Sequence, residues 1–251
     1  MLVEADTQPK LPRLGGMARP NGVVIVSERY WAFAGDDGSI REGEMPRTAL
    51  SRVPLLRGLV KLGAALSPLF RHSGVAGGRE KPVLAVLLVA PLGFVFLPGE
   101  VAWAAWAVAT AGLVLWLFRG RTLRLHGAEH RAIAAVEQRR LAATWAGEAQ
   151  PSRFSPRCGT NFAALVIPVT VVADRVWPLA PALYTPALVT VLSLALTMEL
   201  WRVVQASRAR LARAFLLPGL ALQRLTTREP SVEETRVALT AVESVLRREL
   251  G

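Results

Sequence analysis

The chain has 251 residues, of which 52% are hydrophobic, and it carries a formal net charge of +11. High hydrophobicity together with strong basicity is typical of a membrane protein with a basic cytoplasmic face. The long apolar runs argue against a nucleic-acid-binding class, so we expect no specific DNA binding. The single cysteine, Cys158, excludes an internal disulfide framework, and early charged residues lead us to expect no secretory signal peptide.

The first 81 residues precede the long apolar runs and predict a flexible tail (1–14) and a cytoplasmic unit (15–81). Residues 22–34 are rich in β-branched and aromatic side chains and predict one strand. Asp36-Asp37-Gly38 is a hairpin-turn signal, and residues 39–46 would form a less apolar, returning edge strand. We therefore expect a small N-terminal β unit.

Residues 50–70 carry leucines at helical spacing together with basic side chains, including Arg52, Arg57 and Lys61. This pattern predicts an amphipathic helix. Two placements are open for it: on the membrane surface or packed against the β unit.

Four long uncharged runs follow, and they predict a mainly α, polytopic membrane protein with about four transmembrane helices arranged as two hairpins. The first hairpin would occupy residues 82–118 and the second residues 161–201. The third run is the shortest, because Asp174 and Arg175 interrupt it.

The basic residues predict the orientation of these spans. Of the 30 Lys and Arg residues, only Arg175 would lie outside the cytoplasmic segments. The remainder would fall in residues 1–81, in the loop 119–160 and in the basic C-terminal segment with its amphipathic helix (202–251). The positive-inside rule then places both termini in the cytoplasm. Ser231 and Glu234 form a capping-box pattern for the C-terminal helix.

The loop 119–160 contains a candidate metal motif, H-x-x-E-H, formed by His126, Glu129 and His130. On a helix these positions share one face, and Glu137 extends that face. Cys158 follows just before the third run and approaches from the same side of the membrane. The alternative is a structural cluster in which the two histidines only form hydrogen bonds.

Several segments resemble the bacterial YqhQ-like family, a family of unknown function described as predicted metal-dependent enzymes. The resemblance rests on H-G-A-E-H at 126–130 with Glu137, P-R-C-G-T at 156–160 before Phe162, V-P-L-L-R-G-L-V at 53–60, and P-G-L-A-L-Q-R-L-T-T-R-E-P at 218–230. Order and spacing match over residues 15–245. Two positions depart from the family pattern: Asn21 replaces a glutamate and Ser155 replaces a histidine.

The resemblance implies a multi-pass protein of the bacterial inner (cell) membrane. It also implies a metal-dependent, hydrolase-like enzyme with its site at the cytoplasmic face. The metal, zinc or another divalent ion, would be held by His126, His130 and Cys158, or by the two histidines with Glu129 or Glu137. Glu129 or Glu137 would act as the catalytic base. The two replaced residues raise the alternative that this member has lost part of its site.

A second class of function stays open from the charge distribution. A non-enzymatic membrane factor or scaffold would use the same basic surface to bind anionic lipid, the ribosome or membrane-protein assembly machinery. In both classes the lipid bilayer is a partner. Metal analysis and salt-sensitive copurification separate the two classes.

Overall fold

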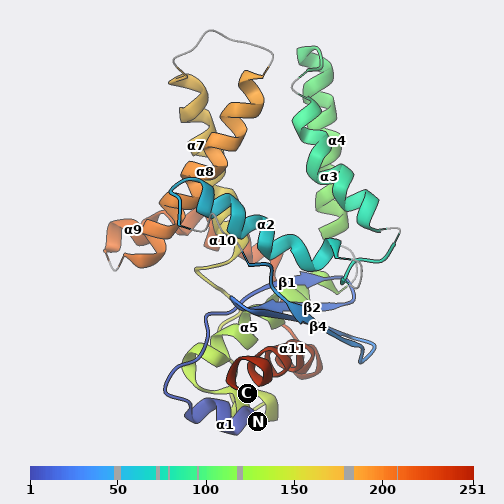
Figure 1. Ribbon diagram of the computed structural model, residues 1–251, viewed down its shortest axis with the longest axis vertical. Helices are drawn as coiled ribbons and strands as arrows, with labels where there is room; N and C mark the ends of the chain where they lie inside the picture. Colours follow the sequence, from blue (N-terminus) through green and yellow to red (C-terminus); the bar gives the residue numbers. More distant parts are fainter. Residues whose placement is uncertain are drawn as a thin grey trace.

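The computed structural model describes residues 1–47, 52–71, 74–78, 80–94, 96–117, 121–177, 184–207 and 209–251. Strands β1–β4 and helices α1, α5 and α11 lie at one end of the molecule, together with both termini (Figure 1). The helix pairs α3–α4 and α7–α8 project from the other end, and α2 lies across the space between the two parts (Figure 1). The described fold is therefore α+β.

The sheet is a four-stranded antiparallel meander in the order β1-β2-β3-β4. Its strands are β1 (Gly15–Arg19), β2 (Gly22–Val26), β3 (Tyr30–Gly35) and β4 (Ile40–Glu44). The predicted turn at Asp36–Gly38 is confirmed, with Gly38 at φ +81°. The predicted edge strand is also confirmed, because β4 is largely exposed.

The stretch 22–34, predicted as one strand, forms two strands joined by a tight turn at residues 27–29. The Ser27 hydroxyl accepts hydrogen bonds from the backbone N–H groups of Arg29 and Tyr30 at 3.2 and 2.9 Å. A serine can replace the glycine or proline that usually marks a turn, because its side chain satisfies the turn's own donors. Strand β1 was not predicted, and it pairs with β2 from Gly15 opposite Val26 to Arg19 opposite Gly22.

Both faces of the central strands β2 and β3 are buried. The side chains of Val23, Ile25, Ala32 and Ala34 join the main core with helices α5 (Thr122–Gln138) and α11 (Val232–Leu250). The alternate side chains Val24, Trp31 and Phe33 pack on the opposite face against Val75. This alternation follows from the two-residue period of a strand.

The ends of the core helices are held by side chains. The predicted capping box of α11 is confirmed: the Ser231 hydroxyl accepts from the Glu234 N–H at 3.1 Å, and the Glu234 carboxylate accepts from the Ser231 N–H at 2.9 Å. At the N-terminus, α1 (Leu2–Thr7) packs against α6 (Leu141–Ala146). Asp6 accepts hydrogen bonds from the first two N–H groups of α6, so the segment predicted as a tail contains a packed helix.

Helix α2 (Leu56–Phe70) packs against α8 (Thr185–Ala206), a contact that the sequence did not predict. Arg57 forms an ion pair with Glu199 of α8, and Gly58 lies against Met198. Glu199 also forms an ion pair with Arg202, at 3.3 Å. The remaining helices are α3 (Glu80–Phe94), α4 (Gly99–Leu117), α7 (Gly159–Arg175), α9 (Arg210–Ala214) and α10 (Leu217–Thr226).

The prediction of a mainly α, polytopic membrane protein with four spans is wrong. Among the described residues one helical segment, Ala187–Ala206, is long and apolar enough to cross a membrane, and the core is built on a sheet. Helix α3 has 15 residues, about 22 Å of helix, against a hydrocarbon core of about 30 Å. Helix α7 has 17 residues and ends in Asp174 and Arg175. The described helices therefore do not support a multi-pass arrangement or the predicted orientation of the termini.

Candidate metal centre

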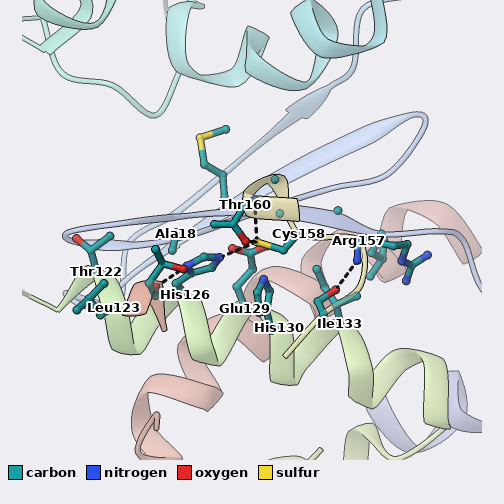
Figure 2. Close-up of a pocket in the computed structure, with 17 residues that line it drawn as sticks. Ala18, Thr122, Leu123, His126, Glu129, His130, Ile133, Arg157, Cys158 and Thr160 are labelled. Carbon is teal, nitrogen blue, oxygen red and sulfur yellow. Dashed lines mark hydrogen bonds between the residues drawn. The ribbon is translucent and has the colours of Figure 1, made fainter. Parts of the chain in front are cut away.

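Helix α5 carries on one face three side chains that can bind a metal ion or transfer a proton. His126, Glu129 and His130 stand at i, i+3 and i+4, and all three point towards the start of α7 (Figure 2). The helix ends at Arg139, which adopts the left-handed conformation with φ 57°. Glu129 and His130 are buried, and His126 is half-buried.

Cys158 lies at the N-cap of α7, opposite this face. Its sulfur accepts from the Thr160 N–H at 3.4 Å and from the Thr160 hydroxyl at 3.3 Å. These two donors hold the sulfur in a fixed position at the start of the helix. The buried cysteine therefore has surroundings that suit a metal ligand.

Backbone carbonyls determine the tautomer of both histidines. His126 Nδ1 lies 2.8 Å from the Thr226 oxygen, and His130 Nδ1 lies 2.6 Å from the Arg153 oxygen. A carbonyl oxygen only accepts hydrogen bonds, so each Nδ1 carries a proton that it donates. Each Nε2 is then left with a free lone pair. A histidine that binds a metal through one ring nitrogen commonly donates the N–H of the other ring nitrogen to a carbonyl in this way.

The two lone pairs and the cysteine sulfur converge. His126 Nε2 lies 3.3 Å from Cys158 Sγ, and the ligand atoms of His126, His130 and Cys158 all lie within 4.8 Å of one another. Ligands around a tetrahedral zinc ion stand roughly 3.3–3.8 Å apart, given Zn–N of ~2.0 Å and Zn–S of ~2.3 Å. His130 Nε2 is buried without a hydrogen-bond partner among the described residues, which a bound cation would satisfy. The cluster could therefore hold a metal ion.

Glu129 lies beside the cluster and is 6% exposed. Burial raises the pKa of its carboxyl to about 7, although the nearby His126 and the Ala18 N–H act in the opposite direction. The side chain lies against Gly16 of β1, where a Cβ atom would come within 2.7 Å of it. Strand β1 thus forms one wall of the site beside Glu129.

A cavity of about 280 Å³ opens in front of these side chains. Its walls come from the β1 segment, from α5 and from the start of α7, and they include Met17, Leu123, Ile133 and Thr160 (Figure 2). Sequence reasoning did not find the β1 wall, because Gly15–Arg19 carries no strand pattern. The cluster therefore borders a space that a small molecule or one end of a larger one can enter.

The carbonyls that orient the histidines are themselves held in place. The segment at Thr226–Pro230 lies close against α5 at Gly127, where a Cβ atom would come within 2.2 Å of the Arg228 oxygen. Arg153 donates to the Thr227 oxygen at 2.9 Å. Arg131 donates to the Pro151 oxygen at 3.1 Å and pairs with Glu229. These contacts join residues 151–153 and 226–230 across α5 and so position both imidazole rings.

Glu137, the other predicted catalytic residue, lies two helical turns beyond His130 and outside the cluster. It pairs with Arg157, whose pKa is lowered by burial and by the charge of Arg13. The structure thus brings together four of the five predicted site residues and places Glu137 at a neighbouring charged group. The catalytic roles of Glu129 and Glu137 stay predictions.

The two positions that depart from the family pattern have different surroundings. Ser155 lines the cavity, and its backbone is held by the Gln223 side chain at 2.9 and 2.8 Å. Asn21 lies in the β1–β2 turn and outside the cavity lining. A histidine at position 155 would stand beside the cluster, whereas position 21 contributes nothing to the cavity lining.

Comparison with known proteins agrees with the predicted YqhQ-like family. The model of the family described as "Protein of unknown function (DUF1385)" matches residues 119–248, a range that contains all three candidate ligands. The uncharacterized protein YqhQ of Bacillus subtilis (strain 168) is 26% identical over 299 aligned positions, which cover 95% of this chain and 93% of that protein. No solved structure matches.

Proposed function

The chain belongs to the DUF1385 family, and we propose that it is a membrane-associated metalloprotein with a zinc centre at His126, His130 and Cys158. One observation carries this proposal. Two imidazole lone pairs, each oriented by a backbone carbonyl, and one sulfur at a helix N-terminus converge within 4.8 Å. A purely structural polar cluster would not leave a buried Nε2 atom without a hydrogen-bond partner among the described residues.

Zinc is the metal that this donor set fits best. Two nitrogen ligands and one thiolate suit a borderline-soft ion, whereas Mg²⁺ and Ca²⁺ require oxygen ligands. Three protein ligands are also the number found in catalytic zinc sites, which keep a further position for water or substrate. The cavity in front of the cluster gives access to that position.

We propose that the centre performs a hydrolytic reaction at the cytoplasmic side of the cell membrane. A metal ion at the cluster would supply Lewis-acid polarisation of the substrate. Glu129 is the carboxyl group that lines the cavity beside the ligands, so it is positioned to accept and return a proton. Gly16 leaves the space that this side chain needs.

Membrane association is assigned to α8. This helix contains the segment that is long and apolar enough to cross a bilayer, and its side chains Leu188, Val191 and Leu196 are exposed. Residues before α7 and after α8 both return to the sheet end of the molecule (Figure 1). Helix α8 would therefore reach the lipid as one arm of the α7–α8 pair.

A second candidate function is a non-enzymatic membrane factor that binds anionic lipid, the ribosome or assembly machinery. Helix α2 favours lipid binding, because this amphipathic helix lies across the foot of the projecting helices (Figure 1) and exposes Lys61, and Arg52, which precedes the helix, is also exposed. In this function the His-Cys cluster would be a structural element. The metal content of the purified protein separates the two candidates.

The test is metal analysis of the full chain purified in mild detergent. We expect about one zinc per chain, and we expect its loss from His126→Ala, His130→Ala and Cys158→Ser. Glu137→Gln is the matched control and should keep its metal, because Glu137 lies outside the cluster. Replacement by Co²⁺ should give a thiolate-to-cobalt absorption band that Cys158→Ser lacks. Equal metal content in all variants, or no metal in any, would disprove the zinc centre.

A further inference from the structure

The cavity at the metal cluster adjoins a second one. That second cavity has a volume of about 230 Å³ and shares Leu14, Ile133 and Arg157 with the first. Arg157 lies next to the cluster because it immediately precedes the ligand Cys158 in the sequence. The two spaces form a groove that leads from the proposed metal position, past the apolar Leu14 and Ile133, to a group of charged side chains.

The charged side chains of this groove are mostly positive. Arg13, Arg139 and Arg157 line the second cavity, against the single carboxylate of Glu137. Arg139 already has partners, because it donates hydrogen bonds to the carbonyl oxygens of Ala5 and Pro9 at 3.3 Å each. Glu137 forms an ion pair with Arg157.

Arg13 stands out in this group. Its side chain is exposed at the groove, and it has no hydrogen-bond or ion-pair partner among the described residues. It nevertheless lies close enough to Arg157 for its charge to act on that guanidinium. Two arginines that face one groove repel each other unless anions offset their charges. Glu137 offsets the charge of Arg157, whereas the charge of Arg13 has no anionic partner among the described residues.

We propose that Arg13 and Arg157 form a phosphate-binding subsite, and that the substrate of the neighbouring centre carries a phosphate group. Two guanidinium groups match the two negative charges of a phosphate and can bind its oxygens in a bidentate manner. The apolar side chains between the subsite and the cluster suit a substrate with a short apolar part beside its phosphate. The statement about the substrate rests on the proposed metal function, whereas phosphate binding itself does not.

Glu137 has a defined part in this subsite. It competes with the ligand for Arg157, so binding of phosphate must weaken the pair between Glu137 and Arg157. Removal of its charge should therefore tighten phosphate binding. If Arg13, Arg157 and Glu137 served folding alone, loss of the Glu137 charge would not tighten phosphate binding while loss of an arginine weakens it.

The experiment is a calorimetric titration of the full chain in detergent with inorganic phosphate, at constant ionic strength. We expect Arg13→Ala to bind phosphate at least tenfold more weakly than the wild type, because a charge-assisted hydrogen bond is lost. Arg157→Lys, which keeps the charge but loses the planar fork, should also bind more weakly. Glu137→Gln should bind several-fold more tightly. Arg140→Ala is the matched control, since Arg140 is exposed and lies outside the groove lining.

The titration is repeated after treatment with a chelator, and metal content is measured on every sample. Retained metal together with weakened phosphate binding in Arg13→Ala supports the subsite. Equal phosphate binding in Arg13→Ala and the wild type, with or without chelator, overturns it even where zinc is present. Binding that disappears with the chelator and ignores Arg13 would locate phosphate at the metal alone and also overturns the subsite. Absence of zinc with Arg13-dependent phosphate binding would disprove the metal function and leave the subsite standing.

Discussion

Backbone atoms decide the chemistry of His126 and His130. Each ring donates from Nδ1 to a carbonyl of a segment distant in sequence, and each Nε2 is thereby turned towards Cys158. The H-x-x-E-H spacing predicts that the two rings share a helix face, but it contains no information about the carbonyls of Arg153 and Thr226. A helix with the same motif and no such carbonyls would leave both tautomers free.

A substitution at Gly127 tests whether metal binding depends on the position of the Thr226 carbonyl. Its Cβ position lies 2.2 Å from the Arg228 carbonyl oxygen, which is backbone and cannot turn away. We expect Gly127→Ala to lower stability by about 1–3 kcal/mol, as overpacking does, and to weaken metal binding because the Thr226 carbonyl is displaced. Thermal unfolding and metal titration measure the two effects.

The control for this substitution is Gly63→Ala in α2. Gly63 has open space around its Cβ position, so alanine there should raise stability by up to ~1 kcal/mol through helix propensity. If Gly127→Ala were as stable as the wild type and bound metal equally well, the close approach of residues 226–230 to α5 would not support the centre.

Local sequence patterns predicted the elements that local interactions stabilise. The Asp36–Gly38 turn, the edge strand after it and the capping box of α11 depend on neighbouring residues alone, and all are present. Strand β1 has no β-branched residue in Gly15–Arg19, and it is a strand only because β2 pairs with it. Long apolar runs indicated four spans, but hydropathy does not show where a helix ends or what covers its sides.

The sequence likewise predicted some parts of the candidate site and missed others. The approach of Cys158 to the two histidines could be predicted, because α5 and the start of α7 are near in sequence and carry recognisable ligand types. The wall at Gly16, the groove at Arg13 and the position of Glu137 could not, since each depends on packing between segments far apart in the chain. Glu137 extends the helix face in sequence, yet two turns of helix and the pair with Arg157 separate it from the cluster.

The capping box at the start of α11 gives the stability of the core a dependence on pH. Burial raises the pKa of Glu234, but the Ser231 N–H and the guanidinium groups of Arg124 and Arg121 outweigh it, so the pKa is below 4.5 in the folded protein. A folded-state pKa that is lower than the unfolded one stabilises the fold above the unfolded pKa. That stabilisation is lost as the pH falls below about 4.5.

We therefore expect Glu234→Gln to be less stable than the wild type at neutral pH, by on the order of 1 kcal/mol. The difference should shrink as the pH is lowered and the wild-type carboxylate is protonated. Chemical unfolding followed at several pH values measures it. Glu243→Gln on the same helix is the control, because its side chain has no hydrogen-bond or ion-pair partner among the described residues, and it should show no such convergence. A constant difference at all pH values would show that packing, and not charge, makes Glu234 stabilising.

Polar and apolar surfaces lie at opposite ends of the described part of the chain. The sheet end holds the polar core contacts and both termini, and the projecting helices at the other end expose large apolar side chains such as Ile167, Val171 and Leu196 (Figure 1). Soluble monomers rarely expose contiguous apolar surface of this kind. If α8 contacts the lipid interior, the protein should stay with the membrane fraction in high salt and leave it only with detergent, because salt screens charge but does not weaken apolar burial.

Leu196→Arg should reduce this retention, since a cation near the centre of a membrane helix costs roughly 2.5–3.5 kcal/mol on an insertion scale. The matched control is Leu250→Arg at the end of α11, which is similarly exposed but lies at the opposite end of the molecule and should be retained like the wild type. Quantitative fractionation of cells that express each variant measures the effect. Release of the wild type by salt, with Leu196→Arg released equally, would instead support peripheral binding through the basic surface that includes Arg52 and Lys61. The zinc centre would then act on substrates that reach it from solution.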